Sequence, residues 1–351
     1  MLKNQKIELE EITIVIITYK RYGFLKRLLS FYASAGYNYN LLVLDSTPNN
    51  PTEEDLLYLL NSNPQLKWVR YDSSIFFVNK IADGCKYINT KYSVLCADDD
   101  FILPSGILKS IDFLESNLEY SCCHGIYYDY ELKNSKKLNF GNIYGQIIGG
   151  EEITSLDRVV NYLNGQTTYY SFYAVHRTSD FKFIWKSSKI YVLDWGLSEN
   201  FPSALSLIIG KMKVMGVPYS IREKNNFVWF DNEREEKMYS LDKIDLFING
   251  LVEALKSEKN EVGELLKSIF YEKLNRSKLK KKAAASKNFS SKKMSIITKI
   301  KNKLKYYYNQ YCQSKLLLKN EHQALKIALL MKNSDDINTS RKDYADQNNV
   351  D

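Results

Sequence analysis

The sequence contains no apolar run that approaches the roughly 18 residues needed for a membrane-spanning helix. The N-terminus, Met1 to Lys6, also lacks the apolar core of a secretory signal peptide. The five cysteines form no CxxC pair and no regular framework, so we expect neither a structural zinc site nor a disulfide scaffold. These absences predict a cytoplasmic protein whose cysteines are reduced and mostly buried.

Two glycine motifs that commonly bind phosphate groups are also missing. No GxGxxG follows the first predicted strand, and no GxxxxGK[ST] occurs anywhere in the chain. A nucleotide site in this protein therefore needs something other than a glycine loop to neutralise the phosphates. A divalent metal ion held by carboxylates would do so.

The net charge of +8 is confined to one part of the chain. Residues 276–305 hold twelve lysines and arginines and no acid, so the rest of the chain is net acidic. This distribution argues against a generally basic surface that binds nucleic acid. Within the basic segment, residues 294–308 fit either an amphipathic helix on an anionic membrane surface or a solvated linker.

With 351 residues, of which 44% are hydrophobic, the chain can build a sizeable core. Its first hundred residues alternate short apolar runs with amphipathic segments, which predicts strands separated by helices. The predicted strands are residues 12–17, 41–44, 66–71 and 92–97. This alternation predicts an α/β fold with a mostly parallel, Rossmann-like sheet flanked by helices.

Polar residues follow three of these strands, at the edge where ligands of parallel sheets bind. They are Thr18, Tyr19 and Arg21 after the first strand, Asp45 after the second, and Asp98, Asp99 and Asp100 after the fourth. Three adjacent carboxylates repel one another, and a divalent cation would neutralise them. The alternative is a solvated acidic turn that caps the helix beginning near Pro104.

The order and spacing of TIVIITYKR (13–21), Asp45 and CADDD (96–100) resemble glycosyltransferase family 2, whose members have the GT-A fold. A later stretch, FYAVHRT (172–178) with residues 202–222, is similar to a bacterial subgroup of glycosyltransferase domain-containing proteins. The resemblance covers roughly residues 12–230. It implies a GT-A type domain that uses a nucleotide-diphospho-sugar donor.

The resemblance also implies roles for the edge residues. Thr18, Tyr19, Arg21 and Asp45 would hold the nucleoside, with Asp45 accepting a hydrogen bond from the base. The three aspartates would bind Mn²⁺ or Mg²⁺ and the ribose or diphosphate of the donor, with Asp98 and Asp99 as donor contacts. The metal ion would offset the negative charge on the leaving diphosphate. If this segment is extended, Asp98 and Asp100 share one face, so we predict these two as metal ligands, with Asp100 at least on the metal.

An inverting sugar transfer needs a carboxylate that removes the proton of the acceptor hydroxyl. By analogy with the family, this base lies at the start of the helix that follows Phe201. Glu199 is the first candidate and Asp194 the second, and the sequence departs from many family members in lacking their Glu-Asp pair. The alternative for either residue is a plain capping acid at the helix N-terminus.

Two further residues and one short segment are candidates on weaker grounds. His176 and Arg177 follow an aromatic, strand-like run at 169–173. We predict a structural hydrogen-bonding role for His176, while Arg177 could reach the diphosphate. Residues 222–226, which follow a predicted strand over 213–221, could close over the diphosphate or form a solvated loop.

These inferences divide the chain into a GT-A catalytic domain (1–235), a helical appendage (236–282) and a basic, partly disordered or amphipathic tail (283–351), in which 316–331 could form a short helix. The predicted function is the metal-dependent, inverting transfer of a sugar to a surface-glycan or lipid-linked acceptor. We expect no nucleic-acid partner. The predicted location is the cytoplasm, or the inner face of the membrane as a peripheral protein. The alternatives are a sugar-phosphate nucleotidyltransferase, or a non-catalytic protein that binds membrane or nucleic acid through residues 276–305.

Overall fold

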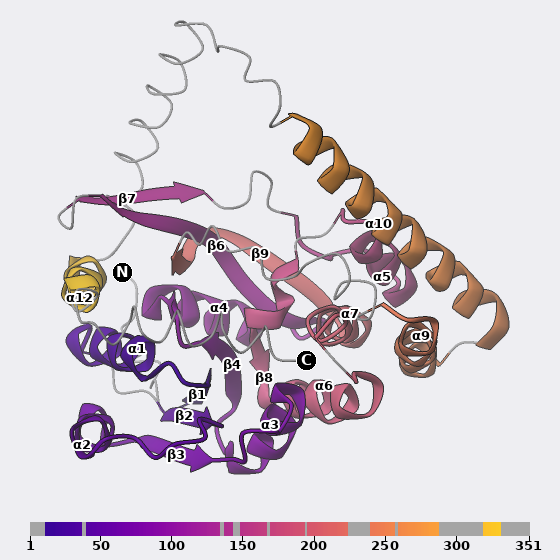
Figure 1. Cartoon of the computed structure of the whole chain (residues 1–351). Helices are drawn as coiled ribbons and strands as arrows, with labels where there is room; N and C mark the ends of the chain where they lie inside the picture. The colour runs from indigo at the N-terminus through magenta and orange to yellow at the C-terminus, as the bar shows by residue number, and fades with distance from the viewer. Residues whose placement is uncertain are drawn as a thin grey trace, which may run out of the picture.

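A computed structural model describes residues 11–36, 40–133, 137–142, 148–166, 169–193, 195–223, 239–256, 259–287 and 319–330 (Figure 1). Within these segments nine strands form one sheet, in the order β3-β2-β1-β4-β8-β6-β9-β5, with β7 paired to β6 outside this path. The strands are β1 (Ile12–Thr18), β2 (Asn40–Asp45), β3 (Leu66–Arg70), β4 (Tyr92–Ala97), β5 (Asp100–Ile102), β6 (Tyr120–Lys133), β7 (Lys137–Asn142), β8 (Val175–Arg177) and β9 (Lys211–Glu223).

The sheet has two halves that differ in strand direction. β3, β2, β1 and β4 pair in parallel, as the alternation of strands and helices predicts. Beyond β4, the short strand β8 runs antiparallel to both β4 and β6, β6 is parallel to β9, and β5 is antiparallel to β9. The α/β fold class is confirmed, with the parallel pairing concentrated in the N-terminal half.

Helices cover both faces of this sheet. They are α1 (Tyr22–Ser34), α2 (Glu53–Ser62), α3 (Phe77–Gly84), α4 (Pro104–Ser116), α5 (Ser155–Leu163), α6 (Thr178–Tyr191), α7 (Asn200–Ile209), α9 (Leu241–Leu255), α10 (Lys259–Lys287) and α12 (Lys319–Leu330), with 3-10 turns η2 (Cys85–Tyr87) and η3 (Tyr169–Tyr173). The turn η2 follows α3 directly, so residues 77–87 form one helical segment. None of the helices described is long and apolar enough to span a membrane.

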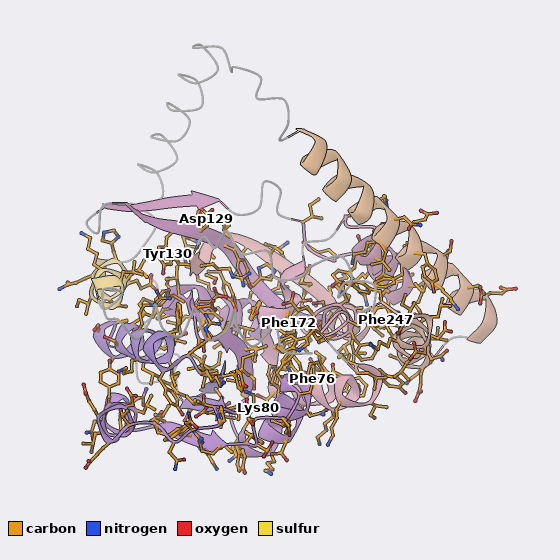
Figure 2. The ribbon with its side chains drawn as sticks, viewed as in Figure 1. Phe76, Lys80, Asp129, Tyr130, Phe172 and Phe247 are labelled. Atoms are coloured by element: carbon orange, nitrogen blue, oxygen red, sulfur yellow. The ribbon has the colours of Figure 1, made fainter. Side chains whose placement is uncertain are left out.

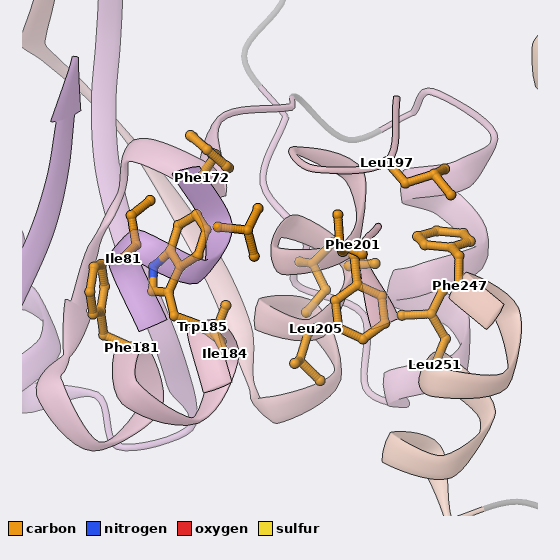
Figure 3. Close-up of a cluster of buried hydrophobic side chains, with 14 of the residues drawn as sticks. Ile81, Phe172, Phe181, Ile184, Trp185, Leu197, Phe201, Leu205, Phe247 and Leu251 are labelled. Carbon is orange, nitrogen blue, oxygen red and sulfur yellow. The ribbon is translucent and has the colours of Figure 1, made fainter. Parts of the chain in front are cut away.

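Side chains of the central strands alternate between two hydrophobic clusters, one on each face. Ile14 and Val94 point into the cluster that includes α1, α4 and α12. Val15 and Leu95 point into the cluster that includes α3, α6, α7 and α9. In the second cluster, Phe201 packs between the buried side chains of α6 and Phe247 of α9 (Figure 3). This period of two is what a strand buried on both faces requires.

The predicted helix at 316–331 is present as α12, which lies beside α1 at the left of Figure 1. Leu325 and Ala328 are fully buried there. The buried carboxylate of Glu321 accepts hydrogen bonds from the backbone N–H and the hydroxyl of Ser105, at 2.7 and 2.9 Å. Glu321 thereby caps α4, whose own N-cap residue provides no side-chain bond. Deletion of residues 276–351 would remove this cap together with the basic segment 276–305. Loss of activity in such a variant would therefore not show whether the basic segment or the damaged domain is the cause.

The region around His176 differs from the sequence expectation. Residues 169–173 form the 3-10 turn η3 and not a strand, because Ala174 N–H bonds back to the Ser171 carbonyl and closes a turn. Arg177 pairs with Tyr92 at the start of β4, the end of the strand remote from the aspartates. Its guanidinium binds the backbone carbonyls at the end of α4, including Leu114 at 2.6 Å. The expectation that Arg177 reaches a diphosphate is therefore wrong.

His176 has the structural role that the sequence predicts, and this role has a measurable consequence. Its Nδ1 donates to the Ala174 carbonyl at 2.9 Å, its Nε2 lies 3.2 Å from Ser206 Oγ, and burial lowers the pKa of the imidazole to about 4. Because this pKa lies below its ordinary value of 6.5, the neutral ring stabilises the fold above pH 6.5 and that contribution is lost as the pH falls towards 4.

We expect the free energy of unfolding of His176→Gln to fall less between pH 7 and pH 5 than that of the wild type, by on the order of 2 kcal/mol. Urea unfolding at the two pH values measures this difference. The change in the free energy of unfolding between the two pH values must be compared in the two proteins, because buried carboxyls with a raised pKa titrate in the same range and stabilise the fold as the pH falls. Equal changes in the two proteins would show that His176 is already protonated at pH 5.

Candidate active site

The three aspartates sit in a turn after β4 and at the start of β5. Asp98 accepts a hydrogen bond from Thr18 Oγ1 at 2.8 Å and pairs with Arg21 at 3.1 Å. The other guanidinium nitrogen of Arg21 lies 2.6 Å from Asp99. Arg21 therefore holds Asp98 and Asp99 together, as two residues of one turn.

Asp100 has a different partner. It lies opposite Arg222 in the antiparallel β5–β9 pairing, and Arg222 Nε approaches its carboxylate at 2.9 Å. The segment is thus not extended, so the argument that places Asp98 and Asp100 on one face does not apply to this geometry. The register between β5 and β9, which joins residues 122 positions apart, decides the partner of Asp100.

Burial and charge act against each other on these carboxyls. Burial raises the pKa of both Asp98 and Asp100 to about 6, opposed by Arg21 and Arg222 respectively, and the neighbouring Asp99 adds to the rise. At Asp99 burial acts in the same direction, but Arg21, Arg222 and Arg27 together outweigh it and lower the pKa. With Lys80, which acts on Asp98, four cationic side chains thus stabilise the charged forms of the three carboxyls at this turn.

The chemistry of these side chains fits a hard divalent cation, because carboxylate oxygens are the ligands that Mg²⁺ and Mn²⁺ prefer. Across the segments that the structure describes, however, no group of three or more histidine, cysteine or acidic side chains has a metal-binding arrangement. Arginines occupy the carboxylates instead. Metal binding therefore requires these ion pairs to rearrange.

A cavity of about 420 Å³ opens at the carboxyl ends of β1 and β4, where the fold class places ligands. One side of it is polar and one side is aromatic. The polar side is formed by Thr18, Arg21, Ser46, Lys80 and Asp98, and the aromatic side by Tyr19, Phe76, Phe77 and Trp195. Of the predicted residues, the cavity brings together Thr18, Tyr19, Arg21 and Asp98.

Lys80 was not singled out from the sequence. It lies close to Phe76 at the start of α3, as Figure 2 shows, and is only 2% exposed. Its ammonium donates to the Thr18 carbonyl at 3.1 Å and to Ser46 Oγ at 2.9 Å, so it joins the ends of β1 and β2. Burial lowers its pKa to about 8, against the charges of Asp45 and Asp98. The signal that could have identified Lys80 in the sequence is its place within the apolar pattern of α3, where a lysine is unusual.

Asp45 is fully buried beneath this edge. One of its oxygens accepts hydrogen bonds from Tyr22 (2.8 Å), Trp68 (3.2 Å) and Arg70 (2.8 Å), and the other accepts from the N–H of Thr47 (2.8 Å). A hydrogen bond from a nucleobase to Asp45 stays a prediction, and because Asp45 is fully buried the residues that cover its carboxylate would have to move aside.

Glu199 is the residue immediately before α7, and its side chain makes no capping hydrogen bond there. Although the residue is solvent-accessible, the surrounding protein raises the pKa of its carboxyl, with Arg222 opposing the rise. The charges of Glu199 and Arg222 both act on Tyr173, whose ring centre lies 5.4 Å from the Arg222 guanidinium. Glu199 therefore lies within electrostatic range of Arg222. Asp194, the second candidate base, lies outside the described residues.

Comparison with known proteins identifies the family and the fold. Residues 13–179 match the model of the family described as Glycosyl transferase family 2. The chain carries a glycosyl transferase family 2 domain. It is accordingly a glycosyltransferase, which replaces the nucleotidyltransferase alternative. A comparison of the sequence with curated proteins finds no significant match.

Solved structures support the GT-A type fold of this glycosyltransferase. It is similar to S. aureus TarS 1–349 in complex with UDP-GlcNAc, with a TM-score of 0.50 and 16% identity over 76% of this chain and 72% of that one. It is also similar to the same protein in complex with UDP, with a TM-score of 0.50 and 14% identity over 76% and 71% of the two chains.

The family 2 match ends before two of the site residues. Glu199 and Arg222 lie beyond residue 179, and the fold pairs Arg222 with Asp100 of the matched segment. The candidate site therefore includes at least one residue, on β9, from the part of the chain that follows the matched domain.

Proposed function

We propose that this glycosyltransferase moves a sugar from a uridine-diphosphate donor to a glycan or lipid-linked acceptor, with inversion and with the help of a divalent metal. The observation that carries the proposal is the cavity that joins Thr18, Arg21, Lys80 and Asp98 at the carboxyl ends of β1 and β4. Because the TarS structures of similar fold contain UDP-GlcNAc and UDP, they support a uridine nucleotide as the donor.

Asp98 and Asp100 would hold Mn²⁺ or Mg²⁺, with Asp99 beside them, and the ion would offset charge on the leaving diphosphate. Arg21 keeps Asp98 and Asp99 oriented at the cavity, and Arg222 does the same for Asp100. Once a cation takes the carboxylates, the two guanidinium groups are free to contact the phosphates, for which their geometry is suited.

Glu199 is proposed as the base that removes the proton of the acceptor hydroxyl. Its raised pKa makes it a stronger proton acceptor than an ordinary carboxylate, which suits proton transfer near neutral pH. Since the residue is open to solvent, an acceptor can reach it. An acceptor activated by this base would attack the sugar carbon on the face opposite the diphosphate, which inverts the configuration at that carbon.

A thermal-shift comparison of nucleotides with Mn²⁺ tests the donor proposal. We expect UDP at about 100 times its Kd to stabilise the protein by about 2.7 kcal/mol, which raises the melting temperature of a chain of this size by about 4 °C. Uridine without phosphates and ADP are the matched controls and should shift it less. If ADP or GDP gives the larger shift, the proposed uridine donor is wrong.

A further inference from the structure

Exposed apolar and cationic side chains form a line along α6 that ends at the cavity. Its apolar members are between half and two-thirds exposed, and its lysines are exposed as well. The line consists of Phe183 (51%), Lys186, Lys189, Ile190 (63%), Leu193 (58%) and Trp195 (53%) and is called the α6 stripe below. The spacing of residues 183, 186 and 190 places them on one face of α6, and Leu193 and Trp195 follow the end of this helix at Tyr191.

The opposite face of α6 is fully used by the core. Phe181, Ile184 and Trp185 are buried and pack with Ile81 of α3 and with Phe172, as Figure 3 shows. Packing within the domain therefore accounts for the buried face and not for Phe183 or Ile190. Large exposed apolar side chains gathered on one face mark an interaction surface.

One end of the α6 stripe lies next to the candidate active site. At one end of α6, Lys182 Nζ donates to the carbonyl of Ile88, just beyond η2. At the other end, Trp195 stacks on Phe77, the first residue of α3, with ring centres 4.7 Å apart and planes inclined by 30°. α6 thus runs antiparallel to α3 and η2, and the stripe ends on the aromatic side of the cavity.

The charge around the stripe has one dominant sign. Lys86 on η2 is exposed beside it, and with Lys186 and Lys189 it gives three cations. Two acids lie nearby: Asp83, which Lys86 pairs at 2.9 Å and whose pKa both Lys86 and Lys189 help to lower, and Glu253 of α9, which accepts a hydrogen bond from Tyr191 of α6. The surface therefore combines separated apolar side chains with a net positive charge.

We propose that the α6 stripe docks this enzyme on an anionic phospholipid surface. Protein interfaces are depleted in lysine at their cores, whereas lysines between aromatic and aliphatic side chains suit a headgroup layer, in which tryptophan is also favoured. The inference rests on the proposed function, in which the acceptor is lipid-linked. Because the stripe continues into the cavity wall at Trp195, docking brings the cavity to acceptors held at the membrane.

Flotation of the full chain with vesicles tests this surface. We expect the wild type to bind vesicles that contain phosphatidylglycerol, and to bind phosphatidylcholine vesicles at least about tenfold more weakly. Phe183→Ser/Ile190→Ser should weaken binding to the anionic vesicles by about tenfold or more. Lys186→Glu/Lys189→Glu should do the same without removing any apolar side chain.

The matched control is Leu118→Ser/Ile153→Ser, which removes apolar residues that are 82% and 91% exposed elsewhere, and it should bind like the wild type. A UDP-dependent thermal shift in every variant shows that the fold and donor site are intact. The inference is overturned if the wild type ignores anionic vesicles, if both stripe variants bind them like the wild type, or if the stripe variants only convert a dimer to a monomer. A wild type that shows the UDP shift but no vesicle binding refutes the stripe and leaves the proposed donor standing.

Discussion

Asp100→Asn is expected to lower metal-stimulated hydrolysis of the donor by at least about 100-fold, because it removes a carboxylate from a site that must hold a cation against the diphosphate. The asparagine keeps the shape of the side chain and a carbonyl oxygen opposite Arg222, so the β5–β9 pairing should persist. Release of UDP from UDP-GlcNAc with and without Mn²⁺ measures the effect.

Asp112→Asn makes the same chemical change on an exposed position of α4 and should leave hydrolysis unchanged. Arg222 is 28% exposed, so water can solvate its charge when the carboxylate is lost, and we expect the melting temperature to change little. Full activity in Asp100→Asn would remove this residue from the metal site and leave Asp98, which lines the cavity, as the better candidate.

Glu199→Gln is expected to lower transfer to an acceptor by about 100- to 10,000-fold while UDP binding is preserved. The amide cannot take up the proton of the acceptor hydroxyl, whereas the donor contacts lie on β1 and β4 and are untouched. Product formation with a glycan acceptor measures the first effect, and the thermal shift with UDP measures the second.

Glu272→Gln on the exposed side of α10 is the matched control and should behave like the wild type. Loss of both transfer and UDP binding in Glu199→Gln would indicate a binding role. Wild-type turnover would pass the role of base to Asp194, and Asp194→Asn should then lose transfer in the same assay.

The N-terminal half of this fold was predictable because it depends on local patterns. Each strand from β1 to β4 is a short apolar run, and each helix between them has its own apolar spacing. The rule that parallel strands present their carboxyl ends at one edge then brings Thr18 and Asp98 together, and they are hydrogen-bonded at 2.8 Å. The strand-like reading of residues 169–173 was wrong because aromatic residues suit both a strand and the short turn η3.

The partners of the charged residues were not predictable in the same way. Arg222 reaches Asp100 only through the register of β5 and β9, and Glu321 reaches Ser105 across 216 positions of the chain. Lys80 owes its importance to two oxygen atoms at the ends of β1 and β2, neither of which has a sequence signature. Such contacts depend on how elements pack and not on local periodicity.

The sequence by itself determined the α/β class, the family and the position of the three aspartates after β4, because strand patterns and motif spacing are properties of neighbouring residues. Only the tertiary structure decided which charge each aspartate faces, that Asp45 is enclosed by four protein donors, and that Glu199 shares the surroundings of Arg222. The physical reason is that electrostatic interactions are set by distance and burial, which arise when remote segments pack together.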